Sequence, residues 1–430
     1  MAKRNYKDSY YDLLDITRDR VVLHSDLNNF FASVETLFQP SLKDVPMAIC
    51  GNEKERHGII LAKNEKAKRF GIKTGEPVKS AREKCRNLVT CPSRYPEYVK
   101  FSRAVREVYL KYTPHVEPFG IDEAWLDVSA IAHRRQGSLF ENAECIADEI
   151  KKAVFCETGL RVSVGVSFNK VYAKLASDMK KNSGTTVISP ENYISVVGRL
   201  PVRDLLYVGK NTEELLKRNR LFTMADVTRH KRSYLGEIFG KKGEYVWDFA
   251  KGFDFSPVAS YTAEENTESV SNSRTLPYDI DNVKDAESVL FSLCESVVER
   301  IRERKLTCGR IGVFIRKCDL TIVTRQLKLG KQTDSLFEIY TSVAELFRAN
   351  ADFSKPLRGL GVSLENFESK GLCQLSVFDT PRDLKRAEID KMLDEMKVKH
   401  GDGVICRASS LVKKELSNFD KKHPAFNHNL

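Results

Sequence analysis

Apolar and polar residues alternate along the first 170 positions in a pattern that predicts strands and helices in a mixed order. An apolar strand over Val21–Asp26 is followed by a helix, because Phe30, Val34, Leu37 and Phe38 recur at helical spacing. The later elements are helices over Tyr98–Tyr112 and Leu139–Cys156, a hairpin over Val116–Ser129 and a strand over Arg161–Val166. Strand, helix, hairpin, helix and strand make the βαββαβ order of a ferredoxin-like domain, with residues 30–93 inserted after its first strand.

A second set of alternating segments follows a polar, acidic stretch at residues 256–268 that predicts a linker. Strands are predicted over Ser269–Leu276, Ile311–Arg316, Thr321–Leu329 and Arg358–Leu364, with helices over Ala286–Arg304 and Ser335–Phe347. This β-α-β-β-α-β series predicts a second, smaller domain in which helices and a sheet are again combined. The fold class expected for the whole chain is therefore α+β.

The segment between the two domains is expected to be helical and to contain a tight glycine turn. Residues 200–212, followed by a helix over Glu213–Asn219, predict a helix-hairpin-helix, whose turn amides can hold a DNA phosphate. The residues at that turn are Val208, Gly209 and Lys210. Such hairpins usually have two glycines, and Tyr207 stands where the first would be, so a plain pair of antiparallel helices stays an alternative.

Three carboxylates fall at the ends of predicted strands. Asp26 ends the first strand, and Asp122 and Glu123 stand at the tip of the hairpin. A solvated turn is the ordinary interpretation of an acidic dipeptide. Three hard oxygen ligands at the ends of buried strands instead favour a pair of Mg²⁺ ions that hold a triphosphate.

The charge distribution points to a polyanionic partner. The formal net charge is +11, and residues 54–106 alone contain fifteen Lys or Arg against five Asp or Glu. The ten cysteines include no CxxC pair, so neither a zinc site nor a disulfide framework is expected. No apolar run reaches membrane-spanning length and the first residues show no signal core, so a cytoplasmic protein without a membrane partner is expected.

Five motifs occur in one order along the chain: VVLHSDLNNFFASVE, AKNEKAKRFGIKTGEP, GIDEAWLDVS, RVSVGVSFNKVYAKLASDMKKNSG and LPVRDLLYVGK. Together they resemble the Y-family translesion DNA polymerases, in particular their bacterial DNA polymerase IV and V branch, over roughly residues 20–380. The resemblance implies a palm at 1–29 and 94–180, fingers at 30–93 and a thumb at 181–255. It further implies a DNA-binding little finger at 269–370 and a tail at 371–430.

The resemblance also assigns roles to residues of the active site. Asp26 and Asp122 would be shared by two Mg²⁺ ions, with Glu123 and the Leu27 carbonyl completing the two sites. Phe31 would block a ribose 2′-hydroxyl, which implies dNTP substrates. Lys68 and Lys181 would contact the triphosphate. The family usually has Tyr where Glu65 stands and Arg where Lys68 stands, and this departure leaves nucleotide affinity open.

Further contacts are implied with primer-template DNA and with a sliding clamp. Basic residues on or beside the strands of the second domain would grip DNA phosphates, namely Arg274, Arg310, Arg316, Arg325 and Lys328. A solvated sheet face is the alternative for them. The tail resembles the pentapeptide with which bacterial polymerases hold the clamp, through Gln374, Leu375, Val377 and Phe378.

The function implied is template-directed, low-fidelity DNA synthesis past damaged bases by a monomeric enzyme. Two alternatives stay open on the sequence. A catalytically weak DNA-binding scaffold at the clamp would explain the departures at Glu65 and Lys68. A two-metal nucleotidyl cyclase could have a similar acidic hairpin, but it would not explain Phe31 or the second domain.

Overall fold

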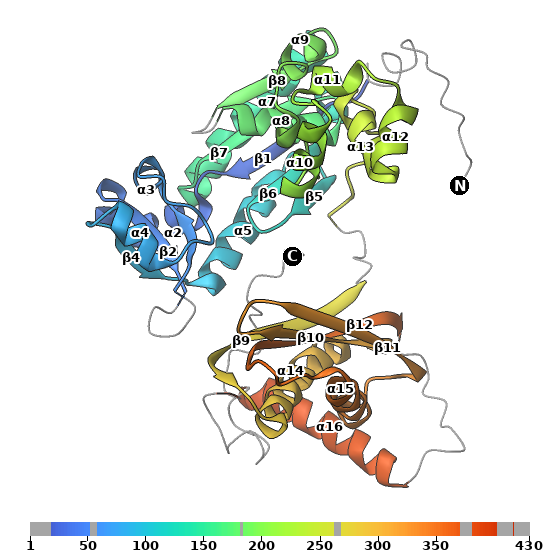
Figure 1. The fold of residues 1–430 in the computed structure, drawn as a ribbon. Coiled ribbons are helices and arrows are strands. Elements are labelled where there is room, and N and C mark those ends of the chain that lie inside the picture. The colour runs from blue at the N-terminus through green and yellow to red at the C-terminus, as the bar shows by residue number, and fades with distance from the viewer. Residues whose placement is uncertain are drawn as a thin grey trace. The chain divides into compact units, whose positions relative to one another are not determined.

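A computed structural model describes residues 19–51, 58–180, 184–261, 268–369 and 381–401 of the chain, together with Leu416. The described residues form two compact units (Figure 1). The first contains residues 19–51 and 59–261, and the second begins at residue 268. Each unit has a hydrophobic core of its own.

A five-stranded sheet forms the centre of the first unit. Its strands are β1 (Val22–Leu27), β5 (Val116–Phe119), β6 (Glu123–Asp127), β7 (Val162–Ser167) and β8 (Thr185–Ile188), in the order β5-β6-β1-β7-β8. β1 lies antiparallel between β6 and β7, which is the ferredoxin-like arrangement predicted from the sequence. β8, which pairs in parallel with β7, extends the sheet by a strand that the pattern did not predict.

Helices cover both faces of this sheet because successive side chains of a strand point to opposite sides. Leu23 belongs to the core formed with α5 (Tyr95–Leu110) and α7 (Leu139–Thr158). Its neighbour Val22 packs instead with Ala173 of α8 (Lys170–Met179). The side chains of β1 that follow Val22 at every second position, His24 and Asp26, are therefore on the α8 side.

The insertion after β1 is a small α/β layer with its own core. It contains α2 (Phe30–Phe38), a 3₁₀ turn (Pro40–Asp44), β2 (Met47–Cys50), β3 (Ile60–Lys63), α3 (Glu65–Arg69), α4 (Val78–Lys84) and β4 (Val89–Pro92). Its sheet has the order β3-β2-β4. The first of these elements, α2, is the helix that the sequence pattern predicted after the first strand.

Short helices complete the first unit. They are α6 (Ser129–His133), α9 (Tyr193–Val197), α10 (Lys210–Arg218), α11 (Met224–Thr228), α12 (Arg232–Phe239) and α13 (Lys241–Ala250). The predicted hairpin differs from the structure in its first half, which is only a 3₁₀ turn over Val202–Asp204. Tyr207 takes the left-handed conformation there, with φ of +68°, and so adopts the backbone shape for which glycine is usually needed.

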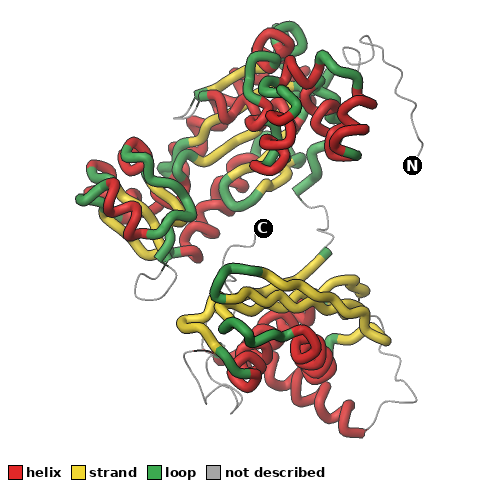
Figure 2. Tube along the Cα trace, in the orientation of Figure 1, coloured by secondary structure: helices red, strands yellow, loops and turns green. Residues whose placement is uncertain are grey.

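The second unit is a four-stranded antiparallel sheet with two helices on one face (Figure 2). Its elements are β9 (Ser269–Ile280), α14 (Val283–Glu303), β10 (Leu306–Lys317), β11 (Ile322–Thr333), α15 (Leu336–Asn350) and β12 (Leu357–Ser369), with the strand order β11-β10-β12-β9. The predicted β-α-β-β-α-β series and the α+β class are thereby confirmed. A further helix, α16 (Pro381–His400), is tied to α14 because Arg302 pairs with Asp390 at 2.6 Å and Asp394 at 3.1 Å.

Of the linker predicted at residues 256–268, the structure describes 256–261 and residue 268, and the part up to Tyr261 is attached to the first unit. The Ala259 N–H donates to the Glu117 carboxylate at 2.9 Å, and the Tyr261 N–H donates to the Pro114 carbonyl at 3.1 Å. None of the helices in the described part of the chain is both long and apolar enough to cross a membrane.

Candidate active site

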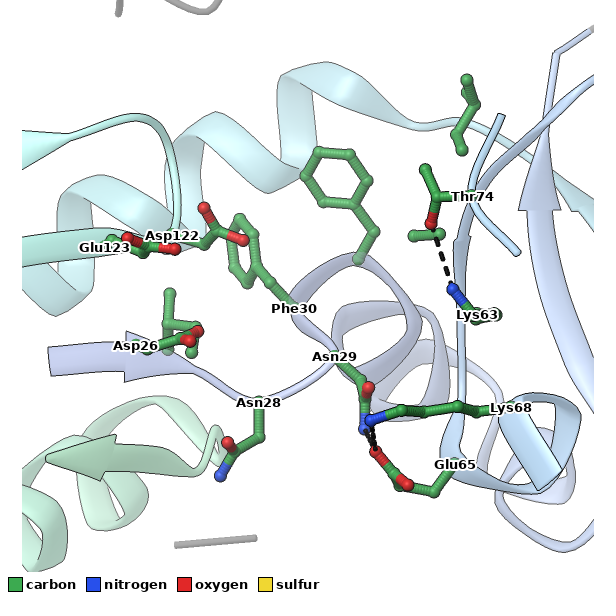
Figure 3. Close-up of a pocket in the computed structure, with 14 residues that line it drawn as sticks. Asp26, Asn28, Asn29, Phe30, Lys63, Glu65, Lys68, Thr74, Asp122 and Glu123 are labelled. Carbon is green, nitrogen blue, oxygen red and sulfur yellow. Dashed lines mark hydrogen bonds and ion pairs between the residues drawn. The ribbon is translucent and has the colours of Figure 1, made fainter. Parts of the chain in front are cut away.

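The three predicted carboxylates lie together at one end of the first unit's sheet (Figure 3). Asp26 and Glu123 are directly opposite each other in the β1–β6 register. Gly120 has φ of +74°, a left-handed conformation that lets the β5–β6 hairpin turn tightly before Asp122. The Leu27 N–H donates to the Asp122 carbonyl at 3.0 Å, which ties the hairpin tip to the end of β1.

The carboxylates differ strongly in their affinity for a proton. Burial and the negative charges of Glu123 and Asp26 raise the pKa of Asp122 to about 7. Burial opposes ionisation of Glu123 too, but His24 and the Lys174 ammonium outweigh it and lower the pKa of Glu123 to about 2. The hairpin therefore carries one strongly ionised carboxylate beside one that holds its proton to neutral pH.

Two residues that the sequence analysis missed contact Glu123. Lys174 of α8 forms an ion pair with it. His24 Nε2 lies 3.2 Å from a Glu123 oxygen without the alignment of a hydrogen bond, while its Nδ1 lies 2.8 Å from Ser177 Oγ. Burial lowers the pKa of His24, which is fully enclosed. The signal for His24 was its position two residues before Asp26, on the same side of the strand.

The donor set fits hard divalent cations, although the side chains are not closed around one. Within the described ranges, no three His, Cys, Asp or Glu side chains converge as ligands of a single ion. The raised pKa of Asp122 comes partly from two neighbouring carboxylates, and a bound cation would relieve that repulsion. All three side chains offer carboxylate oxygens, which Mg²⁺ prefers as ligands.

A cavity of about 340 Å³ separates the carboxylates from the inserted layer. It is lined by Asp26, Leu27, Asn28, Asn29, Phe30, Phe31, Leu61, Ala62, Lys63, Glu65, Lys68, Thr74, Asp122 and Glu123. The acidic wall comes from β1 and the β5–β6 hairpin, and the basic wall from β3 and α3, as Figure 3 shows. The predicted residues Leu27, Phe31 and Lys68 thus share one cavity with the carboxylates.

The basic wall contains an additional lysine that the sequence analysis did not select. Lys63 is the last residue of β3 and donates to the Thr74 hydroxyl at 3.1 Å. Burial, and then repulsion by Lys68, lowers the pKa of Lys63. Lys68 pairs with Glu65 at 3.5 Å, and Glu65 also accepts a hydrogen bond from Asn29 at 3.3 Å. Part of the charge of Lys68 is therefore already balanced, whereas Lys63 brings its charge to the cavity beside a neutral hydroxyl.

The five basic residues predicted to bind DNA are divided between the two faces of the second unit's sheet. Residues that pair across antiparallel strands share a face. Arg274 pairs with the core residue Leu360, and Arg325 pairs with the core residue Val313, so both are on the helix-covered side. Arg274 donates to the Leu416 carbonyl at 2.7 Å there, and Arg325 donates to Asn350 of α15 at 3.1 Å.

Arg310, Arg316 and Lys328 share the opposite, open face of this sheet. Lys328 is directly across from Arg310 on the neighbouring strand. Arg310 also faces Glu365, with which it forms an ion pair of 3.5 Å. Between Arg310 and Arg316 this face has Gly312, paired to Ser363, and Phe314, paired to Gly361.

The remaining predicted contacts lie at the 3₁₀ turn and outside the described residues. Val208 is buried, whereas Gly209 caps the N-terminus of α10 and Lys210 is exposed at its first position. Lys181 and the predicted clamp residues Gln374, Leu375, Val377 and Phe378 fall outside the described part of the chain.

Comparison with known proteins gives consistent matches over most of the chain. The family model described as impB/mucB/samB family matches residues 25–178, and the model of that family's C-terminal domain matches residues 267–377. A protein of Acetivibrio thermocellus named DNA polymerase IV is 42% identical over 377 residues, which cover 87% of this chain and 92% of the relative. A DNA polymerase IV of Clostridium acetobutylicum is 33% identical, with coverage of 92% of this chain and 99% of the relative.

A solved structure of a Y-family DNA polymerase chimera has the same fold. It superimposes with a TM-score of 0.72 at 26% sequence identity, covering 81% of this chain and 99% of the chimera. The match therefore extends over both units.

Proposed function

The chain belongs to the impB/mucB/samB family of Y-family DNA polymerases, and we propose that it adds dNMP from dNTP to a primer 3′-hydroxyl by two-metal-ion phosphoryl transfer. Membership of this family makes it a DNA-directed DNA polymerase of the translesion type. The single observation that supports its chemistry best is the cavity with three carboxylates on one wall and lysines on the other.

The acidic wall is the proposed metal site. Asp26 and Asp122 would be shared by two Mg²⁺ ions, Glu123 would hold the ion near the primer, and the Leu27 carbonyl the ion near the nucleotide. When bound, the ions would lower the pKa of the primer hydroxyl and stabilise the leaving pyrophosphate. The positive charge of Lys174 helps to keep the Glu123 carboxylate ionised, which is the form that binds a cation.

The opposite wall is the proposed site for the triphosphate and the sugar. Lys63 and Lys68 would neutralise phosphate oxygens, and Lys181 would add a further contact. Phe31 lines the same cavity and would exclude a 2′-hydroxyl. Since phosphoryl transfer depends chiefly on positioning and charge neutralisation, these residues need no covalent role.

The open sheet face of the second unit is the proposed surface for the DNA backbone. Lys328 and Arg310 are directly opposite each other, and like charges in such positions destabilise an isolated sheet. A phosphate bound between them would relieve that repulsion. The turn at Gly209 and Lys210 would hold a second phosphate, and residues Gln374–Phe378 a sliding clamp. We further propose that the enzyme acts as a monomer in the cytoplasm.

Primer extension tests the proposed reaction. A primer-template with Mg²⁺ and dNTPs should be extended by the wild-type chain and not by Asp122→Ala/Glu123→Ala, while both proteins bind DNA equally. Extension that survives in the double variant would place the metal site elsewhere. A wild-type chain that binds DNA but never extends it would instead favour the scaffold function at the clamp.

A template with an abasic site tests the translesion role. The wild-type chain should extend a primer past this site, because we propose that its small fingers, residues 30–93, leave the nascent base pair open to solvent and so do not require a template base of normal shape. Complete arrest at the lesion, with normal extension on an intact template, would contradict this part of the proposal.

A further inference from the structure

A buried polar network lies directly behind Phe31, on the side away from the cavity. The Phe31 ring is stacked on the ring of Tyr98, with 4.2 Å between centroids and 14° between planes. Tyr98 belongs to α5 and is fully buried. Its hydroxyl donates to Glu35 Oε1 at 2.6 Å. Glu35 is one helical turn after Phe31 on α2. The same helix therefore carries both the Phe31 ring and the carboxylate that binds the Tyr98 hydroxyl.

Arg94 completes the network and fixes the carboxylate of Glu35. The Arg94 Nε–H lies 3.2 Å and 3.1 Å from the two Glu35 oxygens, and a second nitrogen of Arg94 also donates to this carboxylate. The guanidinium is in turn stacked on the Phe38 ring at 4.2 Å. Burial raises the pKa of Tyr98, so its hydroxyl stays protonated and remains a donor at every physiological pH.

This arrangement does more than fill space. A buried carboxylate that needs an arginine and a tyrosine is a costly way to support a phenylalanine, which an apolar neighbour could pack equally well. What the network adds is a fixed direction, because a hydrogen bond of normal geometry tolerates little movement of the Tyr98 ring. Phe31 rests on that ring and cannot withdraw from the cavity unless Tyr98 moves as well.

We infer that Tyr98 and Glu35 are positioning residues that hold Phe31 against the sugar of the incoming nucleotide and thereby set the discrimination between deoxyribonucleotides and ribonucleotides. This inference rests on the proposed function of Phe31. A steric block is effective only if the blocking ring cannot yield, and here the resistance comes from the stacked Tyr98 ring and its bond to Glu35. Loosening either residue should therefore admit a 2′-hydroxyl without altering the metal site.

The test measures the ratio of kcat/KM for a ribonucleotide to that for the matching deoxyribonucleotide, in single-nucleotide insertion by the full chain. Tyr98→Ala removes the ring behind Phe31 and should raise this ratio about tenfold, which corresponds to about 1.4 kcal/mol. Tyr98→Phe and Glu35→Gln keep the packing and should each give a smaller rise. The ratio should rise because kcat/KM for the ribonucleotide increases, while kcat/KM for the deoxyribonucleotide stays nearly constant.

Two controls separate positioning from general loosening. Tyr109 is another buried tyrosine of α5, whose hydroxyl lies 2.8 Å from Ser25 Oγ, so Tyr109→Phe removes a comparable hydrogen bond away from Phe31. It should leave the sugar ratio unchanged. Phe31→Ala should raise the ratio most, and Phe31→Ala/Tyr98→Ala should raise it no further, because Tyr98 acts through Phe31.

The outcomes distinguish this inference from the proposed function. If Phe31→Ala changes the ratio while Tyr98→Phe, Glu35→Gln and Tyr98→Ala leave it at the wild-type value, the positioning role is wrong and the sugar-blocking role stands. If Phe31→Ala itself leaves the ratio unchanged, the proposed role of Phe31 fails, and the inference fails with it. Should Tyr98→Ala not fold, Tyr98→Phe and Glu35→Gln decide alone. An equal rise in Tyr109→Phe would also overturn the inference.

Discussion

At the scale of single residues, the acidic hairpin contains a carboxyl group, that of Asp122, whose ionisation is unfavourable in the absence of a bound cation. Burial and two neighbouring carboxylates raise the pKa of Asp122 to about 7, well above its ordinary value of 3.8. The folded chain therefore retains a proton on Asp122 at pH values where the unfolded chain has lost it. The contribution of Asp122 to the free energy of unfolding falls as pH rises from about 4 to about 7 and stays low above that range.

Asp122→Asn should consequently stabilise the metal-free protein at alkaline pH. At pH 8 with a chelator, the gain in the free energy of unfolding should be about 2 kcal/mol, a value reduced from the full shift because the side chain is partly solvated. Below pH 4 the two proteins should be equally stable. Denaturant unfolding at several pH values measures this, and a gain that is independent of pH would show that ionisation of Asp122 is not its cause.

Lys63 provides a second prediction at this scale. Its ammonium reaches the cavity beside Thr74, whereas Lys68 is already paired with Glu65. Lys63→Ala should raise the KM for dNTP about tenfold, the effect of losing about 1.4 kcal/mol of phosphate binding. Lys66→Ala is the matched control, since Lys66 lies on the neighbouring helix, does not line the cavity and pairs with Asp44 at 3.4 Å. Equal effects of the two changes would indicate only a general loss of positive charge.

The sequence alone predicted the carboxylates of the cavity and Lys68, but not Lys63 or Lys174. Asp26, Asp122 and Glu123 could be found because each interrupts an apolar strand at its end, where a carboxylate is unexpected. Lys63 and Lys174 could not, because a lysine at the end of a strand or on a helix is ordinary. Only the packing of β3 and α8 against the site shows where their ammonium groups point.

At the scale of elements, α8 approaches the sheet closely enough to reach Glu123 because β7 has a glycine at the crossing point. A Cβ at Gly165 would lie 1.9 Å from the Ala173 carbonyl oxygen and 2.4 Å from the Ser177 nitrogen. Both are backbone atoms of α8, so a larger residue would force the whole helix away from the sheet.

Gly165→Ala should therefore reduce the free energy of unfolding by about 3 kcal/mol, as overpacking against backbone does. It should also weaken catalysis, because Lys174 moves with α8. Gly209→Ala is the control: Gly209 has an ordinary φ of −82°, and a Cβ there would meet no atom within 4 Å. Thermal unfolding of both variants gives the comparison, and a fully stable Gly165→Ala would show that α8 can shift without cost.

At the scale of elements, helices and strands with a long, regular hydrophobic period could be predicted from the sequence. Features that depend on a single turn or on the register between strands could not. The βαββαβ order of both units follows from helices and strands of clear period. The first half of the predicted hairpin did not form a helix, and Tyr207 took a conformation that no propensity assigns to tyrosine. Arg274 and Arg325 could not be separated from Lys328 by sequence, because the face of a strand depends on its register with its neighbours.

At the scale of the whole molecule, the cavity and the open sheet face proposed to bind DNA belong to different units. The cavity with its carboxylates belongs entirely to the first unit, and the open basic sheet face belongs entirely to the second. Composition could not indicate this division, because residues 260–370 hold sixteen basic against seventeen acidic residues. The open face is basic only because the strand register collects Arg310, Arg316 and Lys328 on it.

Removing a cation from the open face should therefore weaken DNA binding without changing the chemical step. Lys328→Ala should lower the affinity for primer-template and reduce the slope of log K against log salt by about 0.9, the contribution of one phosphate contact. At saturating DNA its kcat should equal that of the wild-type chain. Arg325→Ala is the matched control, because Arg325 is on the opposite, helix-covered face of the same strand and donates to Asn350 instead. Affinity measured across a salt series should separate the two variants, and an equal loss in both would mean that the strand contributes to DNA binding only through its total charge.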